Sequence, residues 1–345
     1  MFYLKYRPRT IDEIDNTRVR SILQKILESK KIPHALLFVG QKGTGKTSAA
    51  RIFSKAINCL NNKFGGKGKD FEPCNDCANC RAIARSTFTD VLELDAASNR
   101  GIEEVKSLIR EVAFLPMSGR FRVFIIDEAH MITPDGFNAL LKTLEEPPDS
   151  AVFILATTNL EKLPTTIVSR CVKVNFGKGR IDDINNMLKR IIKAEGLVFA
   201  PEVLHLVAQR SDYSFRDAAK MIEEIATQKM KTLPDVEVFL GLKGRSDILE
   251  IIAEKNSKKT FQWIEEFRGS GGDFKNLLED MLDKLRLQLL IKKGIAVEET
   301  EKLNMTAAEI SKLIKLLMEA YQLMRVTPID SLPLEIAVSE FYNVT

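Results

Sequence analysis

The stretch Gly40-Gln-Lys-Gly-Thr-Gly-Lys-Thr47 decides the fold of this chain, because it fits the phosphate-binding pattern GxxxxGK[ST]. An apolar run, Ala35–Val39, precedes it, and an amphipathic run, Lys46–Cys59, begins within it. The pattern binds nucleotide phosphates in this strand–loop–helix context. Its glycines let backbone N–H groups face the phosphates, and the positive end of the helix adds to their field. The alternative, a glycine-rich turn without a ligand, is disfavoured by the context.

Each residue of this loop is therefore a candidate for nucleotide binding. Lys46 should reach the β- and γ-phosphates, and the Thr47 hydroxyl should hold Mg²⁺. The candidate set is Gly40, Gln41, Lys42, Gly43, Thr44, Gly45, Lys46, Thr47 and Ser48.

A second motif, Phe124-Ile-Ile-Asp-Glu-Ala-His130, supplies two acids. Asp127 ends an apolar run, where a buried carboxylate without a partner is costly, and Mg²⁺ in the phosphate site would be that partner. Glu128 is then placed to polarise an attacking water, which favours an ATPase over a passive binder. Two ordinary acids at a strand end are the alternative.

Short apolar runs alternate with amphipathic runs through the first half of the chain, which indicates a parallel α/β sheet. The predicted strands are Ala35–Val39, Val91–Leu94, Arg122–Ile126, Val152–Ala156 and Val172–Val174. The predicted helices include Lys46–Cys59, Glu103–Phe114, Pro134–Glu146, Ile181–Ala194, Glu202–Arg210, Ser214–Thr227, Leu277–Ile291 and Ala307–Met324. Breaks are predicted at Phe176–Arg180 and Leu242–Arg245, and a surface loop at Asn61–Lys69. No strand is predicted beyond the first break.

The cysteines form a cluster in which Cys59 is followed by Cys74, Cys77 and Cys80. Four thiolates complete a tetrahedral zinc site without an open position, which is typical of structural zinc. An iron–sulfur cluster is the second possibility, and free reduced thiols are the third. Replacing Cys77 with serine should loosen the segment Asn61–Arg81 and leave nucleotide binding largely intact. The fifth cysteine, Cys171, is predicted to be buried.

Composition sets wider limits. With 345 residues the chain should form two or three domains, and a net charge of +4 does not by itself indicate nucleic-acid binding. No segment approaches the roughly 18 apolar residues of a membrane span. The basic start of the chain has no apolar run behind it, so no signal peptide is expected. An odd number of cysteines with a tight cluster suits a reducing compartment, so we predict a cytoplasmic protein without a membrane partner.

The residues resemble one family closely: the tau/gamma subunits of bacterial DNA polymerase III, the motor subunits of the sliding-clamp loader. The resemblance covers essentially the whole chain. Its carriers, besides the phosphate loop and the cysteines, are Tyr6–Thr10, His34–Phe38, Leu94–Gly101, Ile126–His130, Phe137–Pro148 and Ser169–Cys171.

The resemblance implies three domains. Residues 1–179 would form an AAA+ nucleotide-binding domain with a zinc-binding insertion at 59–80, residues 180–242 an all-α lid, and residues 243–345 an all-α oligomerisation collar. The implied cofactors are ATP, Mg²⁺ and Zn²⁺. The implied activity is ATP hydrolysis that loads the beta clamp onto primer–template DNA within the DNA polymerase III holoenzyme. The implied partners are the delta and delta-prime subunits, further copies of the chain, the beta clamp and DNA. The extension that binds polymerase and helicase in the tau form is not expected within these residues.

The resemblance also assigns roles to single residues. Thr158 matches the polar residue that senses the γ-phosphate, and Arg216 matches the lid arginine that contacts ATP on its own subunit. Arg170 matches the arginine finger that reaches the ATP of a neighbouring subunit, for which a forked, always charged guanidinium is suited. Surface ion pairs are the alternative for both arginines. Arg7 and Pro8 join the nucleotide-binding set.

The chain departs from the family at Asp15-Asn-Thr17, where Val-Gly-Gln is usual, so the family's adenine contacts are not predicted for this segment. DNA contact is expected around Asn99–Lys106, through Arg100 and Lys106 at a helix start, although a solvated helix end is the alternative.

Two other functions compete. A delta-prime-like, non-hydrolysing loader subunit shares the cysteines and Ser-Arg-Cys, but it usually has a degraded phosphate loop, and the intact Lys46, Thr47 and Glu128 argue against it. A zinc-ribbon nucleic-acid-binding module needs basic and aromatic residues around the cysteines. The acids Asp70, Glu72 and Asp76 crowd that segment instead.

Overall fold

A computed structural model covers the 345 residues. It describes residues 1–62, 64, 70–98, 102–230, 232–240, 245–269, 271–295 and 303–343. Most of the predicted loop at Asn61–Lys69, most of the break at Leu242–Arg245 and Arg100 of the expected DNA contact lie outside the described residues. Contacts divide the chain into two compact units, Met1–Thr232 and Leu233–Thr345.

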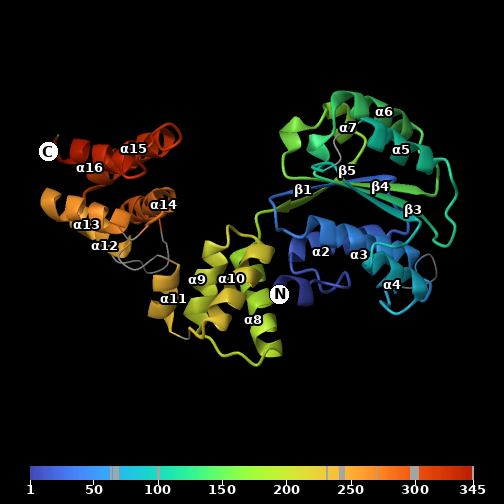
Figure 1. The fold of residues 1–345 in the computed structure, drawn as a ribbon, viewed down its shortest axis with the longest axis horizontal. Helices are drawn as coiled ribbons and strands as arrows, with labels where there is room; N and C mark the ends of the chain where they lie inside the picture. The colour runs from blue at the N-terminus through green and yellow to red at the C-terminus, as the bar shows by residue number, and fades with distance from the viewer. Residues whose placement is uncertain are drawn as a thin grey trace. The chain divides into compact units, whose positions relative to one another are not determined.

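The first unit contains a five-stranded, all-parallel sheet in the order β2-β3-β4-β1-β5 (Figure 1). Its strands are β1 (Ala35–Gly40), β2 (Val91–Asp95), β3 (Arg122–Asp127), β4 (Ala151–Thr157) and β5 (Val172–Gly177). All the predicted strands are therefore confirmed, and each runs one to three residues further at its carboxyl end. The order places the carboxyl ends of β3, β4 and β1 side by side, where parallel sheets usually bind ligands.

Side chains alternate between two cores, one on each face of the sheet. In β1, Leu36 and Phe38 face one core while Leu37 faces the other, and all three are fully buried. Phe124 of β3 and Phe153 of β4 stack with ring centroids 5.1 Å apart in the second core. Burial on both faces explains why these strands are nearly continuous apolar runs in the sequence.

Helices cover both faces of the sheet, as Figure 1 shows. The helices on the first core are α2 (Thr17–Glu28), α3 (Lys46–Asn58) and α4 (Ala78–Ala84). The helices on the second core are α5 (Ile102–Val112), α6 (Pro134–Glu145) and α7 (Thr165–Val168), with the 3₁₀ turns η1 (Ala129–Met131) and η2 (Leu160–Lys162). The helices predicted after the phosphate loop and before the third and fourth strands are confirmed.

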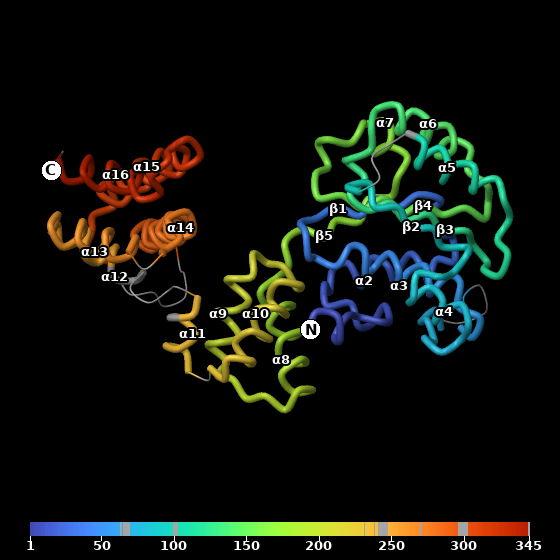
Figure 2. Tube along the Cα trace, in the orientation of Figure 1, coloured from blue at the N-terminus to red at the C-terminus, as the bar shows by residue number. Residues whose placement is uncertain are grey.

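Three further helices of the first unit follow the sheet: α8 (Ile181–Ala194), α9 (Pro201–Arg210) and α10 (Phe215–Thr227). These helices were predicted within one residue at each end. The short helix α1 (Phe2–Lys5) begins the chain and packs on α10, so the N-terminus lies beside these helices (Figure 2). Glu223 of α10 holds this end, because its carboxylate lies 3.2 Å from the Met1 amino group and accepts from the Phe2 N–H at 2.8 Å.

All the regular secondary structure described in the second unit is helical. Its helices are α11 (Leu233–Phe239), α12 (Arg245–Ala253), α13 (Ser257–Gly269), α14 (Phe274–Lys292), α15 (Ala307–Leu323) and α16 (Leu332–Asn343). One apolar core joins α12 to α16. A capping box starts α15, because the Thr306 hydroxyl accepts from the Glu309 N–H and the Glu309 carboxylate accepts from the Thr306 N–H. Among the described residues, no helix has both the length and the apolar character needed to cross a membrane.

Candidate functional site

The phosphate loop lies between β1 and α3, and two of its glycines are required by the backbone. Gly43 has a φ of +79° and Gly45 a φ of +95°, in the left-handed region that glycine adopts without steric cost. A Cβ at Gly43 would also lie 2.0 Å from the Ser214 hydroxyl oxygen. The loop therefore touches the start of α10, and a side chain at position 43 would separate them.

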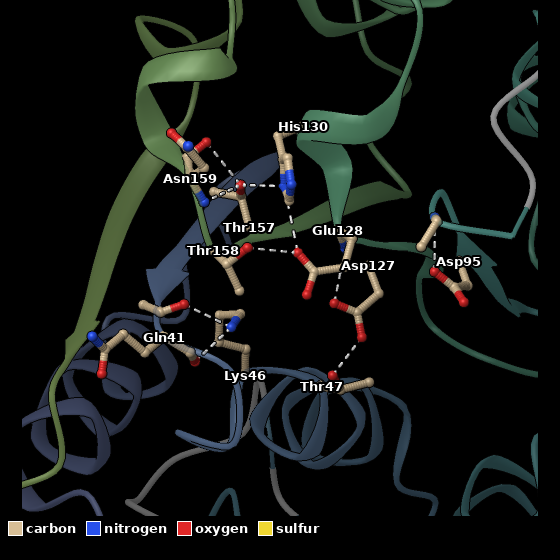
Figure 3. Close-up of polar contacts among 12 residues, drawn as sticks. Gln41, Lys46, Thr47, Asp95, Asp127, Glu128, His130, Thr157, Thr158 and Asn159 are labelled. Atoms are coloured by element: carbon tan, nitrogen blue, oxygen red, sulfur yellow. Dashed lines mark hydrogen bonds and ion pairs between the residues drawn. The ribbon is translucent and has the colours of Figure 1, made fainter. Parts of the chain in front are cut away.

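Lys46 and Thr47 open α3 and hold two different kinds of contact. The Lys46 ammonium is buried and donates to the carbonyl oxygens of Gly40 and Gln41 at 2.8 and 2.9 Å. Burial lowers the pKa of Lys46, while the carboxylates of Glu128 and Asp127 act in the opposite direction. The Thr47 hydroxyl donates to Asp127 Oδ2 at 2.6 Å, so a hydroxyl and a carboxylate converge beside the loop (Figure 3).

Glu128 directly follows β3 and has a left-handed backbone, with φ 46° and ψ 44°. This conformation is uncommon for a residue with a side chain. Its carboxylate accepts from the Thr158 hydroxyl at 3.0 Å, and His130 Nδ1 lies 3.4 Å from the same oxygen (Figure 3). The imidazole in turn lies 3.1 Å from the Thr157 hydroxyl. The carboxylate is therefore held by groups from the ends of β3 and β4.

Two arginines approach the loop from elsewhere in the chain. Arg7 Nε donates to the Ser48 hydroxyl at 2.7 Å, and burial, followed by the nearby guanidinium of Arg51, lowers the pKa of Arg7. Arg216 of α10 lies over the Tyr3 ring at 5.0 Å from its centroid, and its backbone N–H donates to the Gly43 carbonyl at 3.3 Å. Positive charge from three parts of the first unit thus surrounds the loop.

A cavity of about 390 Å³ joins these groups. The predicted site residues that line it are Arg7, Pro8, Lys42, Gly43, Thr44, Gly45, Lys46, Thr47, Ser48, Asp127, Glu128 and Arg216. Gly40 and Gln41 contribute the carbonyls that hold Lys46. Thr158 is exposed and reaches the site through Glu128.

The departure at Asp15-Asn-Thr17 also lies at this cavity, which Asp15 and Asn16 line. Asp15 pairs with Arg190 of α8 at 2.9 Å, and Thr17 Oγ1 lies 3.1 Å from Asp183 of the same helix. Burial raises the pKa of Asp15 to about 6, although Arg190 acts in the opposite direction. This segment thus ties the loop side of the cavity to α8.

Two predicted residues lie away from the cavity. Arg170 follows α7, pairs with Glu145 at 2.5 Å and donates to the Thr166 carbonyl at 2.8 Å, with a third of its side chain exposed. Lys106, the described residue of the expected DNA contact, pairs with Glu103 at 3.1 Å within α5 and is exposed. Neither side chain is among those that line the cavity.

The four clustered cysteines come together as expected, with their sulfur atoms within 4.8 Å of one another. Sulfurs bound to one zinc at about 2.3 Å would lie roughly 3.8 Å apart, so the cluster fits this ion after small shifts. The N–H groups of Cys77 and Cys80 donate to the preceding thiols at 3.3 and 3.4 Å. Burial raises the pKa of Cys74, but N–H groups of Cys77 and Asp76 and the thiols of Cys59 and Cys77 outweigh it and lower the pKa to about 7.

The prediction that Cys171 is buried was wrong, because its side chain is only partly buried in the structure. It precedes β5, the edge strand of the sheet, and packs on the outer part of the second core. Burial still raises its pKa to about 12.

The sequence did not indicate most of the apolar wall of the cavity. That wall is formed by Phe2, Tyr3, Leu4, Tyr6, Ile14, Met187, Ile191, Phe215 and Ala219. Tyr6 and His130 lie within the sequence motifs, but the motifs predict no role for either residue. For the residues on α8 and α10, helical periodicity predicts a buried face without saying what it faces.

In comparison with known proteins, the matched family model and the relatives named below are all described as DNA polymerase III subunits, the model as delta and the relatives as tau or gamma. A family model described as "DNA polymerase III, delta subunit" matches residues 15–179. "DNA polymerase III subunit tau" of Bacillus subtilis (strain 168) is 36% identical, over 97% of this chain and 62% of its own length. "DNA polymerase III subunit tau" of Escherichia coli (strain K12) is also 36% identical, over 81% of this chain and 44% of its own length.

A shorter relative is matched over more of its length. "DNA polymerase III subunit gamma" of Buchnera aphidicola subsp. Baizongia pistaciae is 35% identical, over 84% of this chain and 78% of the relative. This chain therefore spans 62% and 44% of the two tau relatives, less than two thirds of each, and 78% of the gamma relative. Because the gamma relative is 35% identical to this chain over most of both proteins, the chain belongs to the gamma/tau family of DNA polymerase III subunits.

Proposed function

We propose that the chain is the ATP-hydrolysing motor subunit of a bacterial sliding-clamp loader. The observation that carries this is one cavity lined by the phosphate loop, by Asp127 and Glu128, and by Arg216 of α10. Lys46, Arg7 and Arg216 supply positive charge for phosphates, and Glu128 supplies a base for an attacking water. The helix α10 adds a wall from a separate part of the chain. The family supports the same function, because the matched relatives are named as DNA polymerase III subunits.

We also propose the three domains that the family resemblance implies. Residues 1–179 would be an AAA+ domain with a zinc module at 59–80, residues 180–242 a lid over the nucleotide, and residues 243–345 a collar for assembly. The proposed boundary at 242/243 differs from the contact-based division at Thr232–Leu233 in the placement of α11.

The chemistry would come from groups already placed around the cavity. ATP phosphates would replace the carbonyls of Gly40 and Gln41 as partners of the Lys46 ammonium. Thr47 and Asp127 offer two hard oxygens 2.6 Å apart, which suit Mg²⁺. When bound, Mg²⁺ would neutralise phosphate charge. Glu128 would accept a proton from the attacking water. Thr158, whose hydroxyl donates to Glu128, would respond to the γ-phosphate.

The proposed partners are those of a clamp loader: delta and delta-prime subunits, further copies of this chain, the beta clamp and primer–template DNA. The DNA contact remains proposed for residues 99–106, of which Lys106, the fifth residue of α5, is exposed. ATP would close the assembly on clamp and DNA, and hydrolysis would release them. A delta-prime-like role is disfavoured by the intact Lys46, Thr47 and Glu128 and by the names of the relatives.

ATPase measurements on the assembled loader test this function. We expect hydrolysis to be stimulated by primer–template DNA, and further when a sliding clamp is present, because both would favour the closed assembly. Phosphate release is the readout, with clamp and DNA omitted in turn as controls. A loader whose hydrolysis is unchanged when Lys46 of this chain is replaced would instead favour the delta-prime-like role.

We further propose that the four cysteines bind structural zinc, because their sulfurs converge and no histidine or acid joins the cluster within the described residues. Elemental analysis of freshly purified, reduced protein is expected to find about one zinc per chain. Removal of the zinc by a chelator should expose thiols that react with a thiol reagent. Iron in place of zinc would support a cluster instead, and the absence of any metal would contradict both.

A further inference from the structure

The segment Arg7–Asp12, called here the N-terminal strap, runs from the nucleotide cavity to the cysteines. At one end Arg7 and Pro8 line the cavity, and Arg7 is bonded to Ser48 on the helix that the phosphate loop opens. At the other end Ile11 is fully buried in the first core. The strap is thus one continuous piece of chain between two sites.

The first link between the strap and the cysteines is Lys55 of α3. Its ammonium is buried and donates to the Arg9 carbonyl and to Asn75 Oδ1, both at 2.6 Å. Asn75 stands between Cys74 and Cys77 and has a left-handed φ of 62°, so its position depends on the turn that the cysteines form. Because this ammonium is buried, each of its hydrogen bonds counts toward keeping the charge in place.

The second link is Glu72, two residues before Cys74. Its carboxylate accepts from the Ile11 N–H at 2.7 Å and from the Asp12 N–H at 3.1 Å. These two backbone donors lie just beyond Arg9 in the strap. One carboxylate therefore fixes the path of the strap from the side of residues 70–80, called here the cysteine segment.

The opposite side of the cysteine segment is anchored as well. Asn79 donates to the Asn58 carbonyl at 3.0 Å and to the Ser118 carbonyl at 3.1 Å. Asn58 Oδ1 accepts from the N–H groups of Arg120 and Phe121 at 2.8 and 2.9 Å. The cysteine segment is consequently held at the carboxyl end of α3 and can serve as a fixed support for the strap.

We infer that the cysteine segment is a support for the nucleotide cavity: through Glu72, Asn75 and Lys55 it holds the strap so that Arg7 faces the phosphates. This inference rests on the proposed ATP site. Glu72 and Lys55 act as positioning residues, because neither lines the cavity. If the cysteine segment supports the cavity, Cys77→Ser should weaken nucleotide binding as well as disrupt the metal site. This differs from the expectation from sequence, in which nucleotide binding stays largely intact.

Glu72→Gln is the most informative substitution. The glutamine amide has one oxygen, which can accept from only one of the two N–H groups of Ile11 and Asp12, and its NH₂ group faces the second N–H. The strap therefore loses one hydrogen bond, while the cysteines are unchanged. We expect the dissociation constant for ATP to rise roughly 5- to 20-fold. Asp70→Asn is the matched control, because Asp70 is an exposed acid in the same segment, and it should leave ATP affinity unchanged. Lys55→Met should act in the same direction as Glu72→Gln.

A double-mutant cycle with Arg7→Ala separates positioning from general stability. If Glu72 acts through Arg7, Glu72→Gln should have little further effect in the Arg7→Ala background. ATP binding is measured by titration calorimetry, with zinc content and thermal unfolding recorded for each variant. In turnover, KM for ATP should rise while kcat at saturating ATP is maintained.

Distinct results would overturn the inference or the function beneath it. Unchanged ATP affinity in both Glu72→Gln and Lys55→Met, with zinc retained, would overturn the inference and leave the proposed function standing. Equal losses with and without Arg7 would overturn it as well, since the segment would then only stabilise the fold. If the unchanged chain bound no ATP, the proposed function would fail together with the inference.

Discussion

The Lys46→Ala chain is expected to bind ATP roughly 10- to 100-fold more weakly than the unchanged chain, and its hydrolysis should fall to background. Lys46 is the buried cation at the start of α3, 6% exposed, and its ammonium lies at the phosphate loop. Hydrogen bonds to charged groups contribute about 1.5–3 kcal/mol, and about 1.4 kcal/mol is a factor of ten in affinity. Substituting an exposed lysine of α2, Lys25→Ala, is the control and should change neither quantity.

Glu128→Gln should separate binding from turnover. The amide keeps the size of the side chain and can still accept from Thr158, while the contacts of Lys46 and Thr47 are untouched. It can no longer take a proton from water, and loss of a general base lowers rates by about 10²–10⁴. ATP should therefore bind with near-normal affinity and persist.

Chromatography of the bound nucleotide measures this pair of variants. Glu128→Gln should retain ATP after incubation with Mg²⁺, whereas the unchanged chain in the assembled loader should hold ADP. If Lys46→Ala and the unchanged chain bound ATP with equal affinity, Lys46 and its loop would not bind the phosphates of ATP. Normal turnover by Glu128→Gln would show that another group acts as the base.

The sheet and the phosphate end of the site could be predicted from sequence because their physical causes are local. Parallel strands covered on both faces must be apolar at successive positions, as Leu36, Leu37 and Phe38 are, and so they stand out. The phosphate loop needs glycines at fixed offsets, and Gly43 and Gly45 do adopt left-handed backbone. The position of Asp127 followed from the cost of leaving a carboxylate unpaired at a strand end.

The rest of the cavity depends on contacts between distant segments, which leave no local pattern. Two contacts join the start of the chain to helices far along the sequence. Arg216 of α10 lies over the Tyr3 ring, and Arg190 of α8 pairs with Asp15, 175 residues earlier. The links from Glu72 to the strap are of the same kind, since they use backbone donors that any sequence would supply. Such residues look like ordinary surface acids and aromatics until the fold brings them together.

The arginine-finger role proposed for Arg170 requires a neighbouring subunit. Its guanidinium lies away from its own cavity and is paired with Glu145 at the surface. An ion pair between exposed side chains is worth about 0–1 kcal/mol, so Arg170 can leave Glu145 for a phosphate of a neighbouring subunit at little cost. We therefore expect Arg170→Ala to spare ATP binding by the isolated chain.

The same substitution should cut turnover in the assembly by roughly 10³–10⁵ if Arg170 stabilises the transition state as arginine fingers do in related chemistry. Glu145→Gln provides the matched control, because it removes the surface partner and leaves the guanidinium free. It should bind ATP and hydrolyse it as the unchanged chain does. Loss of turnover in both variants would instead indicate that the ion pair supports the fold.

Mixing two inactive chains then tests whether Arg170 acts between subunits. Lys46→Ala chains cannot hold ATP well but still present Arg170, and Arg170→Ala chains hold ATP but present no finger. Where an Arg170→Ala chain sits beside a Lys46→Ala chain in the right order, one complete site forms from two defective subunits. Mixed assemblies should therefore recover clamp- and DNA-stimulated hydrolysis above that of either variant alone. Assemblies of confirmed mixed composition that recover none would show that Arg170 does not work in trans, and the inter-subunit mechanism would lose the residue on which it depends.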